Sequence, residues 1–484
     1  MTIRIGGILF AALVLVFWVS NLAQPRKCLR ILIIASAVSE LFLGCGYLFR
    51  FSNFEVNYYY LPLVLLFVSS FFYSLEANDK QKVLAVYFFF CLYLIFGLLL
   101  RLISNEQIYS LDHSIIADEL WAGKTLVLIK AGSYSFVAFA KTVLFLGSIA
   151  FSSLVLKVND LIKILKTLAW FARFFVIAGA FEFVFINSVS PTALREGVFW
   201  LFGQTSTAVA VPYYRGGLYS PLLACSEPSE VASSLFVSMV ILLASYRLLG
   251  RHHDKFYIFA AFLVSALSLT LTGIVGNLCF LLVLLGAIDK KQRKTALIAM
   301  VALAIVAVMV MIGYPPISRY FSEKIAPGFA MLSYMANGYS DDYIIAHTGG
   351  SVAFRLYSML NVLRVWVKHP LFGVGIGTTS AFSGLVTLLS NIGVIGVGLI
   401  LVLWQRVIRS WTGKRIPFFA VFIEFLFLAL RGGLADFTCS MGFVLCLALE
   451  TMMFRYKGFV LRFGAKEQWA VDPRVLVLML VQKD

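Results

Sequence analysis

Long apolar runs recur along this chain and constrain its fold more strongly than any other feature. The runs at residues 8–23 and 296–312, for example, contain almost no polar side chains. An α-helix that crosses about 30 Å of hydrocarbon needs roughly 20 such residues, because it rises about 1.5 Å per residue. Transmembrane β-strands would instead alternate in polarity over segments of about ten residues. With 61% hydrophobic residues and a mean hydropathy of +0.91, the chain is predicted to be an all-α, polytopic integral membrane protein.

The apolar runs predict about 13 transmembrane helices. They lie near residues 5–23, 29–49, 58–76, 83–103, 135–156, 161–186, 229–248, 256–271, 273–288, 294–313, 381–403, 417–435 and 438–454. Because no soluble region separates them, residues 1–484 are predicted to form a single integral membrane domain.

The positions of Lys and Arg predict how these helices are oriented. Cations gather in alternate connections, and by the positive-inside rule that side of the membrane is cytoplasmic. The N-terminus is then outside, and residues 456–484 form a cytoplasmic tail. The net charge of +16 reflects this topology and attraction to anionic lipid, and it requires no nucleic acid partner. The cations concerned are Arg26, Lys27, Arg30, Lys80, Lys82, Lys157, Lys163, Lys166, Arg251, Lys255, Lys290, Lys291, Arg293, Lys294, Arg406, Arg409, Lys414 and Arg415.

Three connections on the predicted outer side are long enough to fold: residues 104–134, 187–228 and 314–380. Loops longer than about 15 residues in a compact protein are usually functional or disordered. These loops contain aromatic, Arg and Gly residues rather than low-complexity sequence, so we expect ordered lids or short interfacial helices. Residues 187–228 are interpreted as the first functional loop on this outer side, and residues 314–380 as a second, larger one.

Several classes of site lack their sequence motifs. The chain contains no D-x-D, H-E-x-x-H or G-x-x-x-x-G-K-[ST] motif. These absences argue against a divalent-metal glycosyltransferase, a zinc protease and an ATP-driven pump. The 7 Cys residues are scattered without metal-ligand or disulfide spacing. We therefore expect neither a metal nor a cofactor, so any phosphate bound here must be neutralised by protein groups.

Arginine side chains on the predicted outer side are the strongest candidates for binding phosphate. Guanidinium groups form paired hydrogen bonds to phosphate oxygens, so two or three that converge could hold a pyrophosphate without metal. Arg215 lies in the first functional loop, and Arg355 and Arg364 lie nine positions apart in the second. Arg431, near the outer end of a predicted span, is a further candidate. The alternatives are Arg side chains that extend to lipid head groups and, for Arg431, a salt bridge with Glu424.

The segment from Arg215 to Pro228 combines a sharp turn with the start of a helix. Gly216 and Gly217 allow the backbone to turn tightly, either for close approach of a ligand or for a bend alone. Pro228 is favoured in a first helical turn, where free N–H groups attract anions. Glu227 is a candidate general base, or alternatively a charge that complements the helix dipole.

The second functional loop ends in a glycine-rich sequence. His369 precedes Pro-Leu-Phe-Gly-Val-Gly-Ile-Gly, in which Gly373 and Gly375 are expected to let the backbone turn tightly at the membrane edge. The pattern is not a dinucleotide fingerprint, because no βαβ context surrounds it. We expect His369 to be structural. His347 is exposed by its sequence context and titratable, which makes it a second candidate proton acceptor.

These motifs together resemble a known family. Arg215-Gly-Gly-Leu-Tyr, then Glu227-Pro-Ser before a span, then an Arg-containing loop that ends at the glycine-rich sequence, are similar to bacterial O-antigen polymerases and the related O-antigen ligases. Arg364, followed by ten residues and Gly375, also looks like an Arg-x10-Gly pattern of some polymerases. The resemblance covers residues 150–455, and the earlier spans match only in hydropathy.

The resemblance implies a metal-independent glycosyl transfer between two glycans carried on undecaprenyl pyrophosphate, at the periplasmic face of the bacterial inner membrane. Arg215, Arg355 and Arg364 would stabilise the pyrophosphate leaving group, with Glu227 or His347 as the base. The lipid-linked oligosaccharide would serve as both donor and acceptor. A chain-length regulator protein is a further partner that the resemblance suggests, beside the surrounding membrane lipid.

Two alternative functions stay open from the sequence. An O-antigen ligase would transfer the glycan to lipid A core. The resemblance implies a His soon after the large loop of a ligase, whereas no His follows His369 here, which favours the polymerase. A lipid-linked oligosaccharide flippase would also have many helices with charged cavity residues. Its cavity must open to both faces, and long loops on one side count against that.

Overall fold

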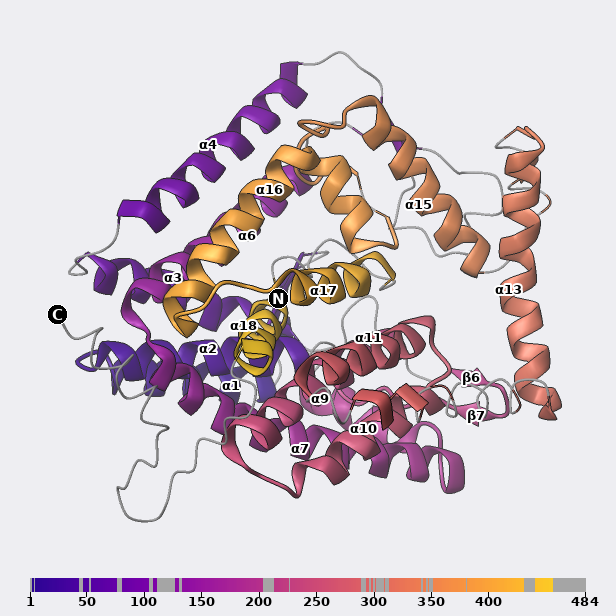
Figure 1. Ribbon diagram of the computed structural model, residues 1–484, viewed down its shortest axis with the longest axis horizontal. Coiled ribbons are helices and arrows are strands. Elements are labelled where there is room, and N and C mark those ends of the chain that lie inside the picture. The colour runs from indigo at the N-terminus through magenta and orange to yellow at the C-terminus, as the bar shows by residue number, and fades with distance from the viewer. Residues whose placement is uncertain are drawn as a thin grey trace.

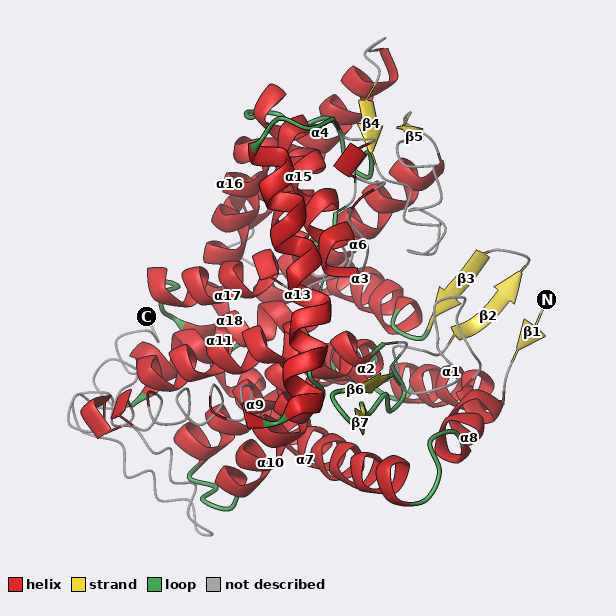
Figure 2. Cartoon of the chain, turned by 90° about the vertical axis from the view of Figure 1, so that its right-hand side faces the viewer, coloured by secondary structure: helices red, strands yellow, loops and turns green. Residues whose placement is uncertain are grey.

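The computed structural model of the protein describes residues 2–3, 5–42, 47–51, 54–75, 81–103, 108–110, 127–129, 133–202, 213–225, 227–288, 293–295, 297–298, 301, 309, 313–340, 343–344, 347, 351–379, 381–430 and 440–455. Within these residues the chain is predominantly helical, as its apolar pattern predicts (Figure 1). Small strands lie at the periphery of the helices (Figure 2). The helical fold class is therefore confirmed for the described part of the chain.

Each predicted span except residues 294–313, most of which lie outside the described part, overlaps a helix, although residues 47–49 at the end of the second predicted span belong to a strand. The helices up to the first functional loop are α1 (Ile5–Val19), α2 (Pro25–Phe42), α3 (Tyr60–Ser74), α4 (Gln81–Ile103), α6 (Ser133–Val155), α7 (Val158–Ser188) and α8 (Ala193–Phe202). The later helices are α9 (Pro228–Leu249), α10 (Asp254–Leu267), α11 (Leu271–Ala287), α13 (Pro315–Ala336), α15 (Ser351–Lys368), α16 (Gly384–Thr412), α17 (Phe418–Leu430) and α18 (Met441–Arg455).

Five of the described helices are long and apolar enough to cross a membrane, namely α4, α6, α7, α9 and α16. Four more apolar helices, α1, α3, α11 and α17, are shorter, with 10–17 residues. Tilting or bilayer thinning is needed for helices of that length to span. The structure thus supports a helical membrane protein, and the larger number of spans stays a prediction.

Helix α9 is enclosed by its neighbours. In its most apolar stretch of 18 residues, 89% are buried, and α7, α10, α11 and α18 surround it. Ser234 on this helix donates a hydrogen bond to the carbonyl oxygen of Leu41 in α2 at 2.6 Å. Small side chains such as Ser233 and Ser238 let neighbouring helices approach closely. This packing gives the N-terminus of α9, next to Glu227, a defined position.

Three small antiparallel sheets stand outside the predicted all-α pattern. Their strands contain two to five residues, which is too short for a clear alternation of polarity. All-α is therefore too simple a description of the predicted loops. The first sheet contains β1 (Thr2–Ile3), β2 (Tyr47–Phe51) and β3 (Phe54–Asn57), the second β4 (Ile108–Ser110) and β5 (Val127–Ile129), and the third β6 (Tyr214–Arg215) and β7 (Leu218–Tyr219).

The predicted large loop contains two long helices, α13 and α15. Helix α13 stands at one edge of the molecule, and α15 lies between it and α16 (Figure 1). A small hydrophobic cluster of Met331, Ile344, Ala353 and Tyr357 joins the two helices. Because this cluster is buried separately from the main core, α13 and α15 form an ordered cover beside the bundle.

Candidate functional site

The segment that carries Arg215 is a β-hairpin whose strands contain two residues each. Strands β6 and β7 pair so that Arg215 stands opposite Leu218. Gly216 and Gly217 form the turn between them, with φ angles of 55° and 89°. A hairpin turn with two positive φ angles favours Gly, which adopts them without steric cost. The Gly pair predicted to bend the chain therefore closes this hairpin next to Arg215.

The hairpin turn fits closely against two other elements. A Cβ atom added at Gly216 would lie 2.7 Å from Cδ1 of Leu269, which follows α10, and 3.1 Å from Cγ1 of Ile317 in α13. At Gly217, an added Cβ would lie 3.4 Å from the hydroxyl of Tyr314. β6 and β7 accordingly lie at one end of α13 in both views (Figure 1, Figure 2). The hairpin thus brings Arg215 to the start of the α13–α15 cover.

Two buried charged side chains hold the backbone that follows the hairpin. The carboxylate of Glu182 in α7 accepts hydrogen bonds from the N–H groups of Leu222 and Leu223, at 3.1 and 2.5 Å. The guanidinium of Arg195 in α8 donates to the carbonyl oxygens of Leu223 and Cys225. Leu223 has a φ of 48°, an uncommon conformation for a residue other than Gly. The bonds from Glu182 and Arg195 therefore hold a strained turn in place.

Asn187 ties the hairpin to the last turn of α7. Its side-chain amide donates to the carbonyl oxygen of Tyr219 at 3.0 Å and accepts from the N–H of Tyr219 at 2.8 Å. These two bonds satisfy both backbone groups of Tyr219. The end of α7 therefore determines the position of the hairpin as well as that of the turn behind it.

Arg215, Arg355 and Glu227 lie within electrostatic range of one another. They come from separate parts of the chain: β6, α15 and the residue before α9. Burial lowers the pKa of Arg355 from its ordinary value, while the negative charge of Glu227 opposes the decrease and the positive charge of Arg215 adds to it. The Cζ atom of Arg215 lies 4.9 Å from the ring centre of Tyr213, and that of Arg355 lies 5.2 Å from the ring centre of Phe382. Two predicted phosphate ligands and one predicted base are thus brought together.

Tyrosine hydroxyl groups accompany these charges. Burial raises the pKa of Tyr213 and the charge of Glu227 raises it further, whereas Arg215 and Arg355 lower it. The net increase keeps this phenol protonated at neutral pH, so it can donate a hydrogen bond to an anion. Tyr320 in α13 also interacts electrostatically with Arg355. The cluster therefore contains the protonated phenol of Tyr213 as a hydrogen-bond donor beside its two cations.

Glu227 is the N-cap residue of α9. Its backbone is extended, with φ −139° and ψ 155°, and Pro228 begins the helix. The carboxylate accepts a hydrogen bond from the hydroxyl of Ser229 at 3.1 Å. It makes no capping bond to the first turn of α9, all of which is described. The side chain is therefore not used as a cap, and the first N–H groups of α9 add partial positive charge beside it.

Arg364, another predicted phosphate ligand, is not among the groups whose charges act on Arg355. Arg364 lies nine residues beyond Arg355 on α15, which is about 13.5 Å along the helix axis, and it is exposed. The charges that act on Arg355 come instead from the hairpin segment, Glu227 and α13. Arg431 lies outside the described residues, so its role stays a prediction.

His347, the second candidate base, lies in an aromatic stack. Its ring centre is 3.8 Å from that of Tyr343, with 17° between the ring planes. Nδ1 lies 2.8 Å from the carbonyl oxygen of Tyr343. Because a carbonyl oxygen accepts and does not donate, Nδ1 carries the proton, and Nε2 of the neutral ring is the nitrogen that can accept one. The described contacts connect His347 with tyrosines rather than with Arg215, so its catalytic role stays a prediction.

The glycine-rich segment after α15 runs along a break in α16. Gly393 interrupts that helix with φ 61° and ψ −178°. The N–H of Gly375 donates to the carbonyl oxygen of Asn391 at 3.0 Å, which satisfies a group that the break would otherwise leave unpaired. Gly373 and Gly375 have φ angles of 68° and 98°, in the region that favours Gly. The predicted tight backbone path is thus built on main-chain contacts.

A cavity of about 450 Å³ lies beside this glycine-rich segment. Its lining includes Lys368, His369 and Gly373, together with Arg101 from the last turn of α4. Arg101 is 7% exposed. A Cβ atom added at Gly375 would lie 3.1 Å from Cβ of Arg101, so the segment passes close to α4. His369 therefore lines a basic cavity at the C-terminal end of α15.

Sequence reasoning missed Arg195, Asn187, Tyr213 and Arg101 as residues that shape these sites. Arg195 binds main-chain carbonyl groups of a distant turn, and no local pattern in the sequence indicates such partners. Glu182 did carry a signal, because an ionisable side chain inside a predicted span is costly unless it is paired. The partner that this side chain requires is the backbone of the turn behind the hairpin.

Comparison with known proteins gives no match: no family model, no curated protein and no solved structure matches this chain. Neither the fold nor the site can therefore be transferred from a relative. The chemistry of the site is inferred from its own residues and their geometry.

Proposed function

We propose that this protein is an O-antigen polymerase: a metal-independent glycosyltransferase that joins undecaprenyl-pyrophosphate-linked oligosaccharide repeat units at the periplasmic face of the bacterial inner membrane. The observation that supports this best is the convergence of Arg215, Arg355 and Glu227 beside the N-terminus of α9. Helices long and apolar enough to cross a membrane are consistent with a substrate carried on an isoprenoid lipid. The resemblance of the surrounding motifs adds to this geometry.

The two arginines suit the leaving group of such a reaction. When the glycosidic bond to undecaprenyl pyrophosphate breaks, negative charge develops on the pyrophosphate. Cations held in place beforehand stabilise that charge without reorganisation. Partial burial of Arg355 removes hydration that would otherwise screen it, and a phosphate would replace that hydration with charge-assisted hydrogen bonds. The free N–H groups of the first turn of α9 contribute in the same direction.

Glu227 is positioned to act as the base in this proposal. A hydroxyl of the acceptor sugar has to lose its proton as it attacks the donor sugar, and a carboxylate within hydrogen-bond reach can accept it. Arg215 and Arg355 orient the donor next to Glu227, so proximity contributes to the acceleration. His347 is the second candidate, through Nε2, if movement of the large loop brings it to the substrate.

Exposed aromatic rings around the cluster suit the sugar portion of the substrate. Tyr213, Tyr214 and Tyr314 are 38%, 65% and 48% exposed, and they lie on or beside the hairpin that carries Arg215. Tyrosine presents an apolar ring face together with a hydroxyl, which fits the apolar faces and hydroxyl groups of sugar rings. In this proposal α13 and α15 cover the glycan while the isoprenoid chain enters from the lipid.

The test is the lipopolysaccharide banding pattern of a deletion strain complemented with variants. Loss of a polymerase leaves lipid A core carrying one repeat unit, so the ladder of longer chains disappears. Arg215→Ala and Arg355→Ala should each lower the polymerisation rate about 10²- to 10³-fold, the typical loss when one donor to a developing oxyanion is removed. Arg319→Ala, an exposed cation on α13, is the matched control and should retain the ladder.

Equal protein levels of the variants, measured by immunoblotting, are required for this comparison. Wild-type ladders from both Arg215→Ala and Arg355→Ala would refute their role in the reaction. A deletion strain with bare core and accumulated lipid-linked polymer would indicate a ligase instead. A strain that accumulates repeat units on the cytoplasmic side would indicate a flippase.

A further inference from the structure

A basic cavity of about 710 Å³ lies where α2 and α7 begin and α3 and α6 end. The residues that line it are distant in sequence from Arg215, Glu227 and Arg355. It is on the side that the distribution of cations predicts to be cytoplasmic. Five cations and one carboxylate contribute to its lining: Arg26, Lys27, Arg30, Lys157, Lys163 and Asp160.

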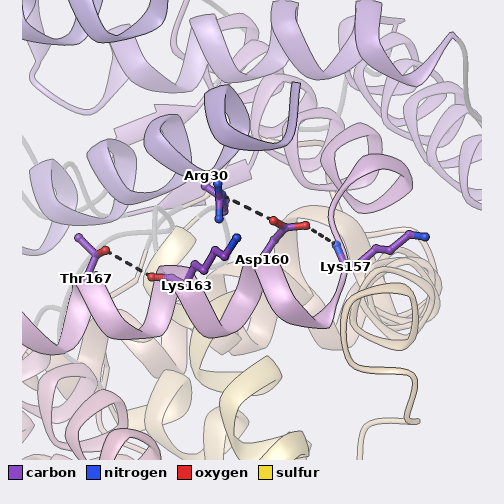
Figure 3. Close-up of polar contacts among 5 residues, drawn as sticks. All are labelled: Arg30, Lys157, Asp160, Lys163 and Thr167. Atoms are coloured by element: carbon purple, nitrogen blue, oxygen red, sulfur yellow. Dashed lines mark hydrogen bonds and ion pairs between the residues drawn. The ribbon is translucent and has the colours of Figure 1, made fainter. Parts of the chain in front are cut away.

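The carboxylate of Asp160 is already engaged by other protein groups (Figure 3). It accepts a hydrogen bond from the N–H of Lys157 at 3.1 Å, which caps the start of α7. Its other oxygen lies 3.6 Å from Nε of Arg30. Asp160 is 5% exposed and so offers little surface to a ligand. One negative charge against five positive charges leaves the cavity strongly positive.

The cations line one cavity from two helices, and the side chains of Arg30 and Lys163 point toward one another there, whereas the side chain of Lys157 extends away from them (Figure 3). Lys163 lies three residues after Asp160 and therefore on the same face of α7, on the side where Arg30 of α2 approaches (Figure 3). Lys157 and Lys163 are exposed. Because α2 and α7 both begin at this cavity, the partial positive charges of their N-termini add to those of the side chains. An anion bound in the cavity would reduce the electrostatic repulsion among these positive charges.

One wall of the cavity is apolar, and its surroundings are suited to lipid. Tyr73, Leu154 and Val155 contribute this wall, and the hydroxyl of Tyr73 is occupied by the carbonyl oxygen of Leu22 at 2.7 Å. Leu75, two residues after Tyr73, is 53% exposed. Helix α7 has 31 residues and is about 46 Å long, so it exceeds a hydrocarbon layer of about 30 Å. This excess length leaves room for its first turns at the level of the lipid head groups.

We propose that this cavity binds the phosphate group of an anionic membrane phospholipid. Basic pockets between transmembrane helices on the cytoplasmic side recognise such head groups, because each nearby cation contributes about 1 kcal/mol. The acyl chains would lie against the apolar wall, and the phosphate would lie near Lys163 and Arg30, with Lys157 at the edge of the site (Figure 3). The site is separate from the proposed glycosyltransferase reaction, so it does not depend on that function.

The experiment compares lipid binding to purified full-length variants by native mass spectrometry, with phosphatidylglycerol as the anionic probe and phosphatidylethanolamine as the zwitterionic one. Lys157→Gln combined with Lys163→Gln removes two charges and should weaken phosphatidylglycerol binding about 10- to 30-fold. Binding of phosphatidylethanolamine should stay unchanged. The matched control is Arg251→Gln combined with Lys255→Gln, which should bind like the wild type. Arg251 lies in the turn between α9 and α10, and Lys255 lies in the first turn of α10, on the same predicted side.

Equal losses in the cavity variant and in the control would show diffuse surface attraction and overturn the proposal, as would unchanged binding in both. Lys157→Arg combined with Lys163→Arg keeps the charges and should keep the binding, which separates a lost charge from a misfolded protein. Loss of binding in that variant would also count against the site. Displacement of the lipid by millimolar inorganic phosphate alone would assign the cavity to a soluble anion rather than to a lipid.

Discussion

The segments 213–227 and 369–379 both join helices through irregular backbone, but they are held in different ways. The first is held by side chains: Glu182 and Arg195 bind the turn around Leu223, and Asn187 binds the hairpin. In the second, the main chain pairs with α16 on both sides of its break, and the side chains of Tyr93, Ser135 and Asn391 add bonds to this backbone. A segment fixed by distant side chains depends on a few residues elsewhere in the sequence, whereas a segment fixed by backbone depends on its own glycines.

This difference bears on the two candidate sites. The side-chain-held segment carries Arg215 and leads to Glu227, so its chemistry depends on residues that touch no substrate. The backbone-held segment lines the cavity at Arg101 with six consecutive residues, 369–374. Replacing the polar and charged side chains that bind the first segment should therefore destabilise it most. Replacing Gly by Ala should destabilise the second segment most. Three substitutions test this contrast.

The largest effect is expected from Arg195→Ala. This change leaves the buried carboxylate of Glu182 without its nearby cation and the carbonyl oxygens of Leu223 and Cys225 without their donor. A hydrogen bond from a charged donor contributes about 1.5–3 kcal/mol, so the loss of both bonds from Arg195 costs about 3–6 kcal/mol. We expect a loss of that size in the free energy of unfolding, measured in mixed detergent micelles. Glu196→Ala, the adjacent exposed residue, should change it by less than about 0.5 kcal/mol.

Arg195→Ala should also disturb the positions of Arg215 and Glu227, because the turn between them loses its support. If Arg195→Ala unfolded no more easily than Glu196→Ala, side-chain anchoring of the hairpin segment would be wrong. Arg195→Lys is informative as well, because Lys keeps the charge but cannot reproduce the planar pair of hydrogen bonds. It should fall between the wild type and Arg195→Ala.

Gly393→Ala should have the next largest effect. Its φ and ψ of 61° and −178° lie in a region open essentially to Gly alone, at a cost of about 1–3 kcal/mol for other residues. An added Cβ would also lie 2.2 Å from the carbonyl oxygen of Leu371, so we expect a total loss of about 2–4 kcal/mol with overpacking included. Gly398→Ala in the same helix meets nothing within 4 Å.

The control, Gly398→Ala, should change the stability in the opposite direction. Gly398 lies in regular helix, where Ala is favoured over Gly by about 0.5–1 kcal/mol, so Gly398→Ala should raise the unfolding midpoint slightly. Similar midpoints for the two alanine variants would show that the break in α16 is not held by its backbone contacts with residues 369–379.

Asn187→Ala should have the smallest of the three effects. It removes two hydrogen bonds to the backbone of Tyr219, each with a net value of about 0.5–1.5 kcal/mol. We expect a loss of about 1–3 kcal/mol in the same unfolding assay. Asn187→Asp keeps an acceptor for the N–H of Tyr219 and loses the donor, so it should be intermediate. A loss for Asn187→Ala as large as that for Arg195→Ala would contradict the proposed order.

Much of the helical fold was predictable, because long apolar runs form helices wherever water is excluded. The short sheets were not, since strands of two to five residues leave no periodic pattern. In the candidate site, Gly216, Gly217 and Pro228 were predictable because their backbone preferences act locally. Arg195 was not, because its partners are carbonyl groups of a turn that exists only in the folded chain.

The sequence by itself determined that this chain forms apolar helices, that Gly216 and Gly217 turn, and that a helix begins at Pro228, because each follows from the residue and its immediate neighbours. It also determined that Arg355 and Arg364, two and a half turns apart, point in different directions. Only the tertiary structure decided that Arg355 lies within electrostatic range of Arg215 and Glu227, because the packing of α15 between α13 and α16 selects the face of α15 that is turned inward.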